Sequence, residues 1–161
     1  ATAALVVSAA VTPFLEGPAR ETMDGLEKTT RDAGRRRTCP VCGSVPTLAQ
    51  IGESQKSMGA GRTLWCGLCR CEWDVERLQC VRCGTRSQNS LRYSHVDGDE
   101  AHRLHLCNNC HAYMRTVFRG NMTVPLSMQV EDIVTAKLEV VGIKEGYSSL
   151  GDTADEGATE V

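Results

Sequence analysis

The stretch CPVCGS at residues 39–44 recurs as CVRCGT at residues 80–85, and each copy opens with a C-x-x-C pair. A second C-x-x-C pair follows the first pair of each copy after 23 intervening residues, so the sequence holds four such pairs. Every cysteine of the later two pairs lies 41 residues after its counterpart in the earlier two. The eight paired thiols are Cys39, Cys42, Cys66, Cys69, Cys80, Cys83, Cys107 and Cys110. A fixed offset of this kind indicates an internal duplication.

A C-x-x-C pair followed by glycine is typical of a metal-binding turn. The two sulfurs approach one ion, and the glycine adopts the positive φ that closes the turn. Two such pairs, separated by about 20 residues, form the four-thiolate tetrahedral sites of zinc ribbons and rubredoxins. The sequence therefore predicts two closed sites, with the simplest pairing inside each repeat. Site 1 comprises Cys39, Cys42, Cys66 and Cys69, and site 2 comprises Cys80, Cys83, Cys107 and Cys110.

Two other arrangements of the same thiols are compatible with the sequence. The pairs could exchange partners between repeats, or the eight thiols could form four disulfides. Disulfides need an oxidising compartment, whereas a free ninth thiol fits a reducing one, so we favour metal. The ninth, Cys71, could be a substitute ligand, but we interpret it as a spare thiol or a small core residue. We expect Trp73, two residues further on, to pack over site 1.

All-sulfur tetrahedral sites accept either zinc or iron, and the order of affinities does not choose between the two metals. Since all four positions are cysteine, no coordination position is free for water or substrate, and we expect no catalytic residues. Closed sites of this kind stabilise the fold or transfer electrons. The four histidines are interpreted as surface groups or as groups that support the ligands without touching the metal. They are His95, His102, His105 and His111, of which His111 is the substitute ligand if a cysteine is absent from its site.

Composition limits the size of the hydrophobic core. The chain has 161 residues, 4% aromatic residues and a formal net charge of −2. Small domains with so few large apolar side chains are usually stabilised by a bound metal or by disulfides. No stretch reaches the ~18 consecutive apolar residues of a membrane helix, and no basic residue precedes Arg20 to mark a secretory signal. We expect a cytoplasmic protein whose sequence begins inside a larger gene product.

The sequence around the cysteines predicts a small metal-bound α+β fold with two tandem rubredoxin-like or zinc-ribbon-like modules and a helix at each end. Strands are expected at 46–51, 62–65, 91–96 and 103–106. Helical spacing relates Leu15, Ala19, Met23 and Leu26, and also the apolar residues from Val130 to Val141. The expected segments are a helical one at 1–38, a first four-cysteine ribbon module at 39–79, a second at 80–119, a closing helical segment at 120–147 and a disordered acidic tail at 148–161.

Five short motifs together resemble the formate dehydrogenase accessory protein family. They are CPVCGS-x-P at 39–46, C-x-x-C-x-x-EW-x-x-x-R-x-x-C-x-x-C at 66–83, C-x-x-C-x-x-Y at 107–113, EDI-x-T-x-x-L at 131–138 and EGY at 145–147. The resemblance covers roughly residues 39–147, and the eight-thiol frame with EW-x-x-x-R between its halves is highly specific. One departure is Glu131-Asp132, where the family usually has two aspartates.

The resemblance implies an assembly factor and not an enzyme. Members of the family are cytoplasmic, carry two rubredoxin-like iron sites, and bind the catalytic subunit of respiratory formate dehydrogenases before export. By this resemblance the eight cysteines would be iron ligands, with zinc as the other metal that fits, and the partner would be that catalytic subunit. Residues 1–38 would be the tail of a truncated N-terminal helical domain.

Two other function classes fit parts of the sequence. Arg35–Arg37 and the arginines of the repeats suit a nucleic-acid-binding zinc ribbon, although few aromatic residues are available to stack on bases. A rubredoxin-like electron carrier would also use closed four-thiolate sites. We favour the assembly factor, without a nucleic-acid partner or membrane insertion. The sequence shows no nucleophile–base motif or phosphate-binding loop, and it leaves the oligomeric state open.

Overall fold

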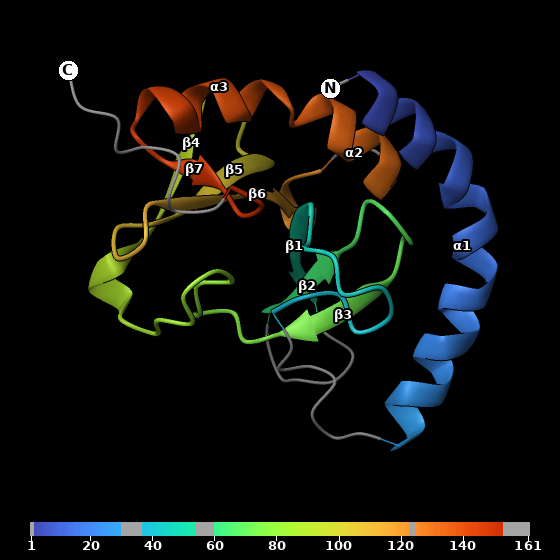
Figure 1. The fold of residues 1–161 in the computed structure, drawn as a ribbon. Coiled ribbons are helices and arrows are strands. Elements are labelled where there is room, and N and C mark those ends of the chain that lie inside the picture. Colours follow the sequence, from blue (N-terminus) through green and yellow to red (C-terminus); the bar gives the residue numbers. More distant parts are fainter. Residues whose placement is uncertain (1, 30–36, 54–59, 123–124, 153–161) are drawn as a thin grey trace.

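A single mixed sheet forms the centre of the molecule (Figure 1). The computed structural model describes residues 2–29, 37–53, 60–122 and 125–152. Six strands follow one another in the order β3-β2-β1-β6-β5-β4, and β7 pairs with β6. The elements of this layer are β1 (Leu48–Glu53), β2 (Ala60–Trp65), β3 (Glu72–Val75), β4 (Leu91–His95), β5 (His102–Cys107), β6 (Ala112–Phe118) and β7 (Ser148–Ser149), with 3-10 turns at Gln88–Ser90 and Arg119–Asn121. The expected α+β fold with helices at both ends is confirmed.

Each cysteine repeat contributes one antiparallel three-stranded unit to the sheet. Strands β1 to β3 come from the first repeat and β4 to β6 from the second. The two units join through parallel pairing of β1 with β6, from Leu48 opposite Arg115 to Ile51 opposite Phe118. Buried residues run without interruption from Leu48 to Ile51, as expected for a central strand that is covered on both faces. The two repeats therefore share one sheet.

Two short helices, α2 (Met128–Val134) and α3 (Lys137–Lys144), cover one face of the sheet (Figure 1). Leu138 of α3 packs in one buried cluster with Leu104 and Leu106 of β5. Met128 of α2 packs in another with Leu48 of β1. The C-terminal helices therefore bridge both repeats.

The sequence predicted one closing helix where the structure has two. Nη1 of Arg115, a buried residue of β6, donates to the Asp132 carbonyl at 2.7 Å. In an unbroken helix this carbonyl would accept from the Ala136 N–H. The Ala136 N–H donates instead to the Ile133 carbonyl at 3.3 Å. The guanidinium from the sheet therefore competes for the helical acceptor at the position where the helix is interrupted.

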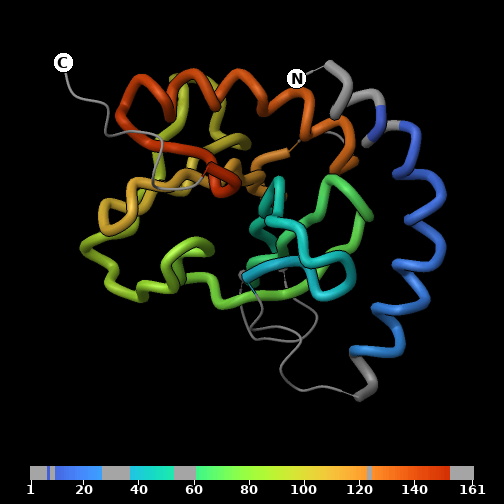
Figure 2. The backbone as a smooth tube through the Cα atoms, in the orientation of Figure 1, coloured from blue at the N-terminus to red at the C-terminus, as the bar shows by residue number. Residues whose placement is uncertain are grey.

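Helix α1 (Thr2–Thr29) lies beside the first repeat (Figure 2). Ala19 and Met23 are buried in the same cluster as the thiols of site 1, and Leu15 and Leu26 pack against it partly buried. The amphipathic N-terminal helix predicted from these four residues is therefore confirmed. No helix in the described parts of the chain has both the length and the apolar character needed to cross a membrane.

The disordered tail predicted from residue 148 does not begin there. Strand β7 pairs in parallel with the start of β6, and Leu150 packs against the cluster that contains site 1. Arg82 holds this segment, because its Nη1 donates to Ser148 Oγ at 2.9 Å and its Nη2 donates to the Ser149 carbonyl at 2.5 Å. Residues 153–161 lie outside the described part of the chain.

We expect Gly142→Ala to destabilise the protein, although alanine is the better helix former. A Cβ at this buried position of α3 would lie 2.8 Å from Cδ1 of Tyr113, whose side chain is itself buried. The overlap should cost about 1–3 kcal/mol, which exceeds the helix-propensity gain of about 1 kcal/mol. Urea denaturation of the purified protein measures the change in the free energy of unfolding.

Gly25→Ala in α1 is the matched control, because nothing lies within 4 Å of a Cβ built at that position. We expect this variant to equal the wild type in stability or to exceed it by up to about 1 kcal/mol. An equal gain in stability from both substitutions would contradict the close packing of Tyr113 under α3.

Candidate metal centres

The first cysteine pair of each repeat forms the same hydrogen-bonded turn. The Cys39 N–H donates to the Ser44 carbonyl at 2.8 Å, and the Gly43 N–H donates to the Cys39 carbonyl at 3.0 Å. In the second repeat the corresponding N–H groups of Cys80 and Gly84 donate to the equivalent carbonyls at 2.9 and 3.0 Å. Gly43 and Gly84 have φ angles of 75° and 77°, so both glycines adopt the predicted positive φ.

The second pair of each repeat makes a similar turn without glycine. Arg70 and His111 have φ angles of 61° and 51°, and each follows the first cysteine of its pair by four residues, as Gly43 and Gly84 do. The Arg70 N–H donates to the Cys66 carbonyl at 2.8 Å. The sequence analysis did not predict a positive φ at these two positions because neither is glycine. Their spacing of four residues from the first cysteine, the same as for Gly43 and Gly84, was the signal that could have indicated it.

The turns bring the thiols of each predicted site together in a group of four. Within each group all Sγ atoms lie within 4.8 Å of one another. The shortest separations are 3.4 Å for Cys39–Cys69 and 3.5 Å for Cys42–Cys66 in site 1. In site 2 they are 3.6 Å for Cys80–Cys110 and 3.8 Å for Cys83–Cys107. A tetrahedral ion with metal–sulfur bonds of about 2.3 Å places its sulfurs about 3.8 Å apart, so both groups have the dimensions of a metal site.

The alternatives of swapped pairs and of disulfides do not match this arrangement. All eight paired cysteines and Cys71 are free thiols. A disulfide requires sulfurs about 2.05 Å apart, well below the separations in either group. The groups also join the two pairs of the same repeat, and not pairs from different repeats.

The thiols of site 1 compete for ionisation. The hydrogen bond from Cys66 lowers the pKa of Cys39 to about 4, and the same contact raises the pKa of Cys66. Burial raises the pKa of Cys69 to about 11. Four thiolates therefore cannot coexist at neutral pH unless a cation lies among them. Metal binding must release protons, so the affinity for a metal decreases on acidification.

Each group has one exposed thiol, and in site 2 Cys110 is partly exposed as well. Cys42 of site 1 and Cys83 of site 2 are exposed, whereas Cys39, Cys66 and Cys69 are buried. Cys83 also accepts a hydrogen bond from Nδ2 of Asn109 at 3.4 Å. The two sites therefore have a closed set of four donors, with one edge that reaches solvent.

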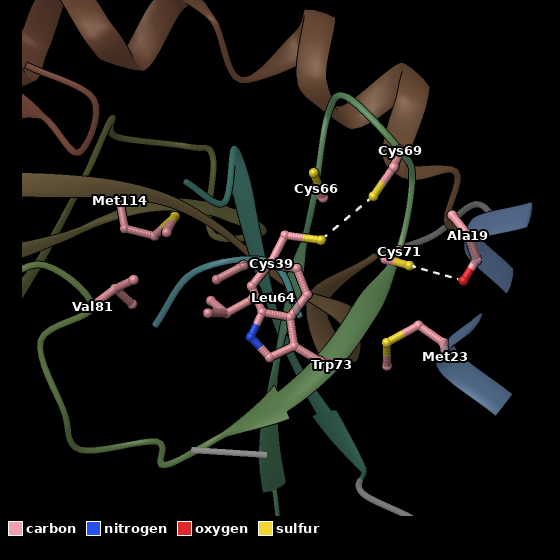
Figure 3. Packing of buried hydrophobic residues seen from close by; sticks show 11 residues of the cluster. Ala19, Met23, Cys39, Leu64, Cys66, Cys69, Cys71, Trp73, Val81 and Met114 are labelled. Atoms are coloured by element: carbon pink, nitrogen blue, oxygen red, sulfur yellow. Dashed lines mark hydrogen bonds between the residues drawn. The ribbon is translucent and has the colours of Figure 1, made fainter. Parts of the chain in front are cut away.

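Cys71 and Trp73 lie in the core next to site 1 (Figure 3). Sγ of Cys71 donates to the Ala19 carbonyl of α1 at 3.5 Å and is not part of the four-thiol group. Trp73 is 2% exposed and shares its buried cluster with Cys39 and the other buried ligands. The interpretation of Cys71 as a small core residue is therefore confirmed, and so is the expected packing of Trp73.

None of the four histidines belongs to either group of thiols. His95 and His111 lie at the surface, as expected, and His95 Nε2 is 3.2 Å from Glu100. His105 is buried, and His102 is largely covered between two carboxylates. The sequence predicted surface or ligand-supporting positions for both histidines, and it did not predict that they lie inside the second repeat.

The acidic pair of the family-like motif points toward the sheet. Glu131 is 4% exposed, and its carboxylate lies 2.8 Å from Nε2 of His102. The Asp132 carboxylate accepts from Nη2 of Arg115 at 2.6 Å. These two contacts fasten α2 to β5 and β6. Neither partner is close in sequence, so no local pattern could have predicted the contacts.

The basic run Arg35–Arg37 lies mostly outside the described residues. Arg37, which is described, donates from Nη1 to the Arg82 carbonyl at 2.5 Å. Its guanidinium therefore holds the start of the first repeat against the first turn of the second.

Comparison with known proteins relates the chain to one family. Residues 38–77 match the model described as FdhE, central domain. The protein FdhE homolog of Haemophilus ducreyi is 32% identical over 126 residues, which are 76% of this chain and 39% of that protein. Protein FdhE of Escherichia coli K12 is 30% identical over 117 residues, which are 71% of this chain and 36% of that protein. The chain therefore spans about two fifths of the length of these curated relatives, and the predicted resemblance is confirmed.

A solved structure shares the fold. The crystal structure of the FdhE protein from Pseudomonas aeruginosa superposes with a TM-score of 0.67 at 22% sequence identity. The match covers 88% of this chain and 48% of that protein. Over most of its length the chain thus has a fold that is known experimentally.

We expect Gly43→Ala to weaken the folded state through backbone strain alone. Nothing lies within 4 Å of a Cβ built at residue 43, but its φ of 75° disfavours any L side chain. The substitution should lower the free energy of unfolding by about 1–2 kcal/mol. Gly120→Ala is the control, because it also has open space and no positive φ. Urea denaturation that shows no difference between the two variants would refute the strained turn.

Proposed function

The chain is a relative of the FdhE proteins, the formate dehydrogenase accessory family, and on that premise we propose that it binds the catalytic subunit of a formate dehydrogenase as an assembly factor. The observation that carries the proposal is the pair of closed four-thiol groups, the first of which lies entirely in the region that matches the FdhE central domain. An all-cysteine donor set leaves no position for substrate. The proposed role is therefore binding and escort, without catalysis by this chain.

Each group of thiols would hold one metal ion. Cys39, Cys42, Cys66 and Cys69 would bind the first, and Cys80, Cys83, Cys107 and Cys110 the second. Iron is favoured by the resemblance, and zinc suits the same donors. A bound ion would supply folding free energy by joining two turns that are far apart in sequence. Thiolate sites of this kind persist in a reducing compartment, so we place the protein in the cytoplasm.

A rubredoxin-like electron carrier is the second candidate. The exposure of Cys42 and Cys83 favours it, because a ligand of each site would reach the protein surface. A protein that binds only zinc when it is produced anaerobically with iron supplied would exclude this role, since zinc has no redox chemistry.

The metal content distinguishes ligands from the neighbouring thiol. We expect two metal ions per chain in the wild type and in Cys71→Ser, and one per chain in Cys42→Ser. Cys71 is the matched control, because it is buried beside site 1 but lies outside the four-thiol group. Elemental analysis and a visible spectrum of protein purified without air provide the measurement. Two metals in Cys42→Ser, or one in Cys71→Ser, would contradict the assigned ligand set.

Binding to the proposed partner can be tested by pull-down with the catalytic subunit of a formate dehydrogenase. We expect the metal-loaded chain to retain the subunit, and the double variant Cys80→Ser/Cys83→Ser to lose it because the second repeat is no longer held together. Circular dichroism verifies which variants fold. Failure of the folded, metal-loaded wild type to bind would refute the proposed partner, and a folded double variant that still binds would refute the need for site 2.

A further inference from the structure

Arg62 is a buried cation with unused hydrogen-bond donors. Arg62 lies on β2 and is 1% exposed, although arginine is almost never fully buried without a partner. Nη1 donates to the Gln79 carbonyl at 2.8 Å, whereas Nε and Nη2 are buried and have no hydrogen-bond partner. No carboxylate of the described residues accepts from it. A buried guanidinium in this state requires a negative charge close by.

The aromatic groups near Arg62 do not supply that charge. Burial raises the pKa of the Tyr93 phenol. Burial, and then the charge of Arg62, lowers the pKa of His105 to about 3. Both rings are therefore neutral at neutral pH, and they stack with their centroids 4.8 Å apart. Burial lowers the pKa of the Arg62 guanidinium, and negative charge on Tyr93 or Cys80 would oppose that shift. Because the Tyr93 phenol is neutral, Cys80 is the group of these two that can supply the charge.

The backbone brings Arg62 to the second site. Gln79 immediately precedes Cys80, so the hydrogen bond from Arg62 reaches the turn that carries this thiol. Cys80 is 4% exposed, and charges that are shielded from water in this way interact strongly. We propose that Arg62, a residue of the first repeat, is the counter-charge of metal site 2 and strengthens the binding of its metal. This inference rests on the proposed occupancy of the two sites.

The chemistry of the donor set explains why a cation is needed there. Four thiolates around a divalent ion carry a net double negative charge, and burial makes that charge costly. A guanidinium in the same low-dielectric region offsets part of it. When the ion is iron, reduction adds one more negative charge, so a nearby cation favours the reduced state.

The repeat provides a matched arginine without this role. Arg103 corresponds to Arg62 at the offset of 41, but its side chain is 25% exposed. Its Nη2 pairs with Glu100 at 2.9 Å, and its guanidinium lies over the Phe118 ring. The charge of Arg103 is therefore already compensated.

The test measures zinc affinity by chelator competition on the full chain. We expect Arg62→Met to weaken zinc binding at site 2 by about 10- to 100-fold, the usual effect of removing a group that supports metal ligands. Arg62→Lys should retain most of the affinity, and Arg103→Met should leave it unchanged. In a Cys83→Ser background, which lacks a site 2 ligand, Arg62→Met should not alter the remaining site.

A second measurement separates charge from shape. With iron in both sites, Arg62→Met and Arg62→Gln should lower the reduction potential of site 2, and Arg62→Lys should restore it. If Arg62→Met does not fold, Arg62→Gln replaces it, since glutamine keeps a donor for the Gln79 carbonyl but no charge.

Two results would overturn the inference without contradicting the two metal sites. One is equal zinc affinity in Arg62→Gln and Arg62→Lys, and the other is an equal loss of zinc affinity at site 1 and site 2. A wild-type chain that binds no metal would instead overturn the proposed function.

Discussion

Sulfur atoms held within 4.8 Å of one another in groups of four cannot all ionise without a cation among them. This electrostatic constraint couples the two C-x-x-C turns of each repeat, which are separated by 23 residues of intervening chain. A bound ion would close that segment and fix both ends of the hairpin between the turns. The same constraint would help a chain with few aromatic residues to form an ordered sheet, because a bound ion would replace part of the missing apolar core.

The duplication produces two similar units with different surroundings. In the first repeat Cys71 and Trp73 fill the core next to α1, and the residues at the same offset in the second repeat are Ala112 and Met114. All four are buried, so these positions are constrained by packing and not by metal binding. The parallel pairing of β1 with β6 then joins the units into one sheet. Each group of thiols lies within its own repeat, and the sheet is what the two repeats share.

The features predictable from the sequence were those encoded by neighbouring residues. Thiol spacing and a following glycine specify a turn within six residues, and a helical apolar stripe specifies α1. Features that depend on distant residues were not predictable. The interruption between α2 and α3 depends on Arg115 from β6, and the ordered start of the C-terminal segment depends on Arg82. The positive φ at Arg70 is imposed by the closed turn against the preference of the side chain.

The acidic pair shows how a family-like motif can reflect the fold and not the partner. Glu131 and Asp132 are engaged by His102 and Arg115, so their carboxylates fasten α2 to the sheet. A longer glutamate in place of the family's usual aspartate still reaches His102, because the imidazole lies 2.8 Å from its carboxylate. These charges are already compensated inside the molecule, and drawing Asp132 away would leave buried Arg115 with Glu139 as its remaining carboxylate partner. The fold therefore accounts for this motif, because its two carboxylates hold the helices that cover the sheet.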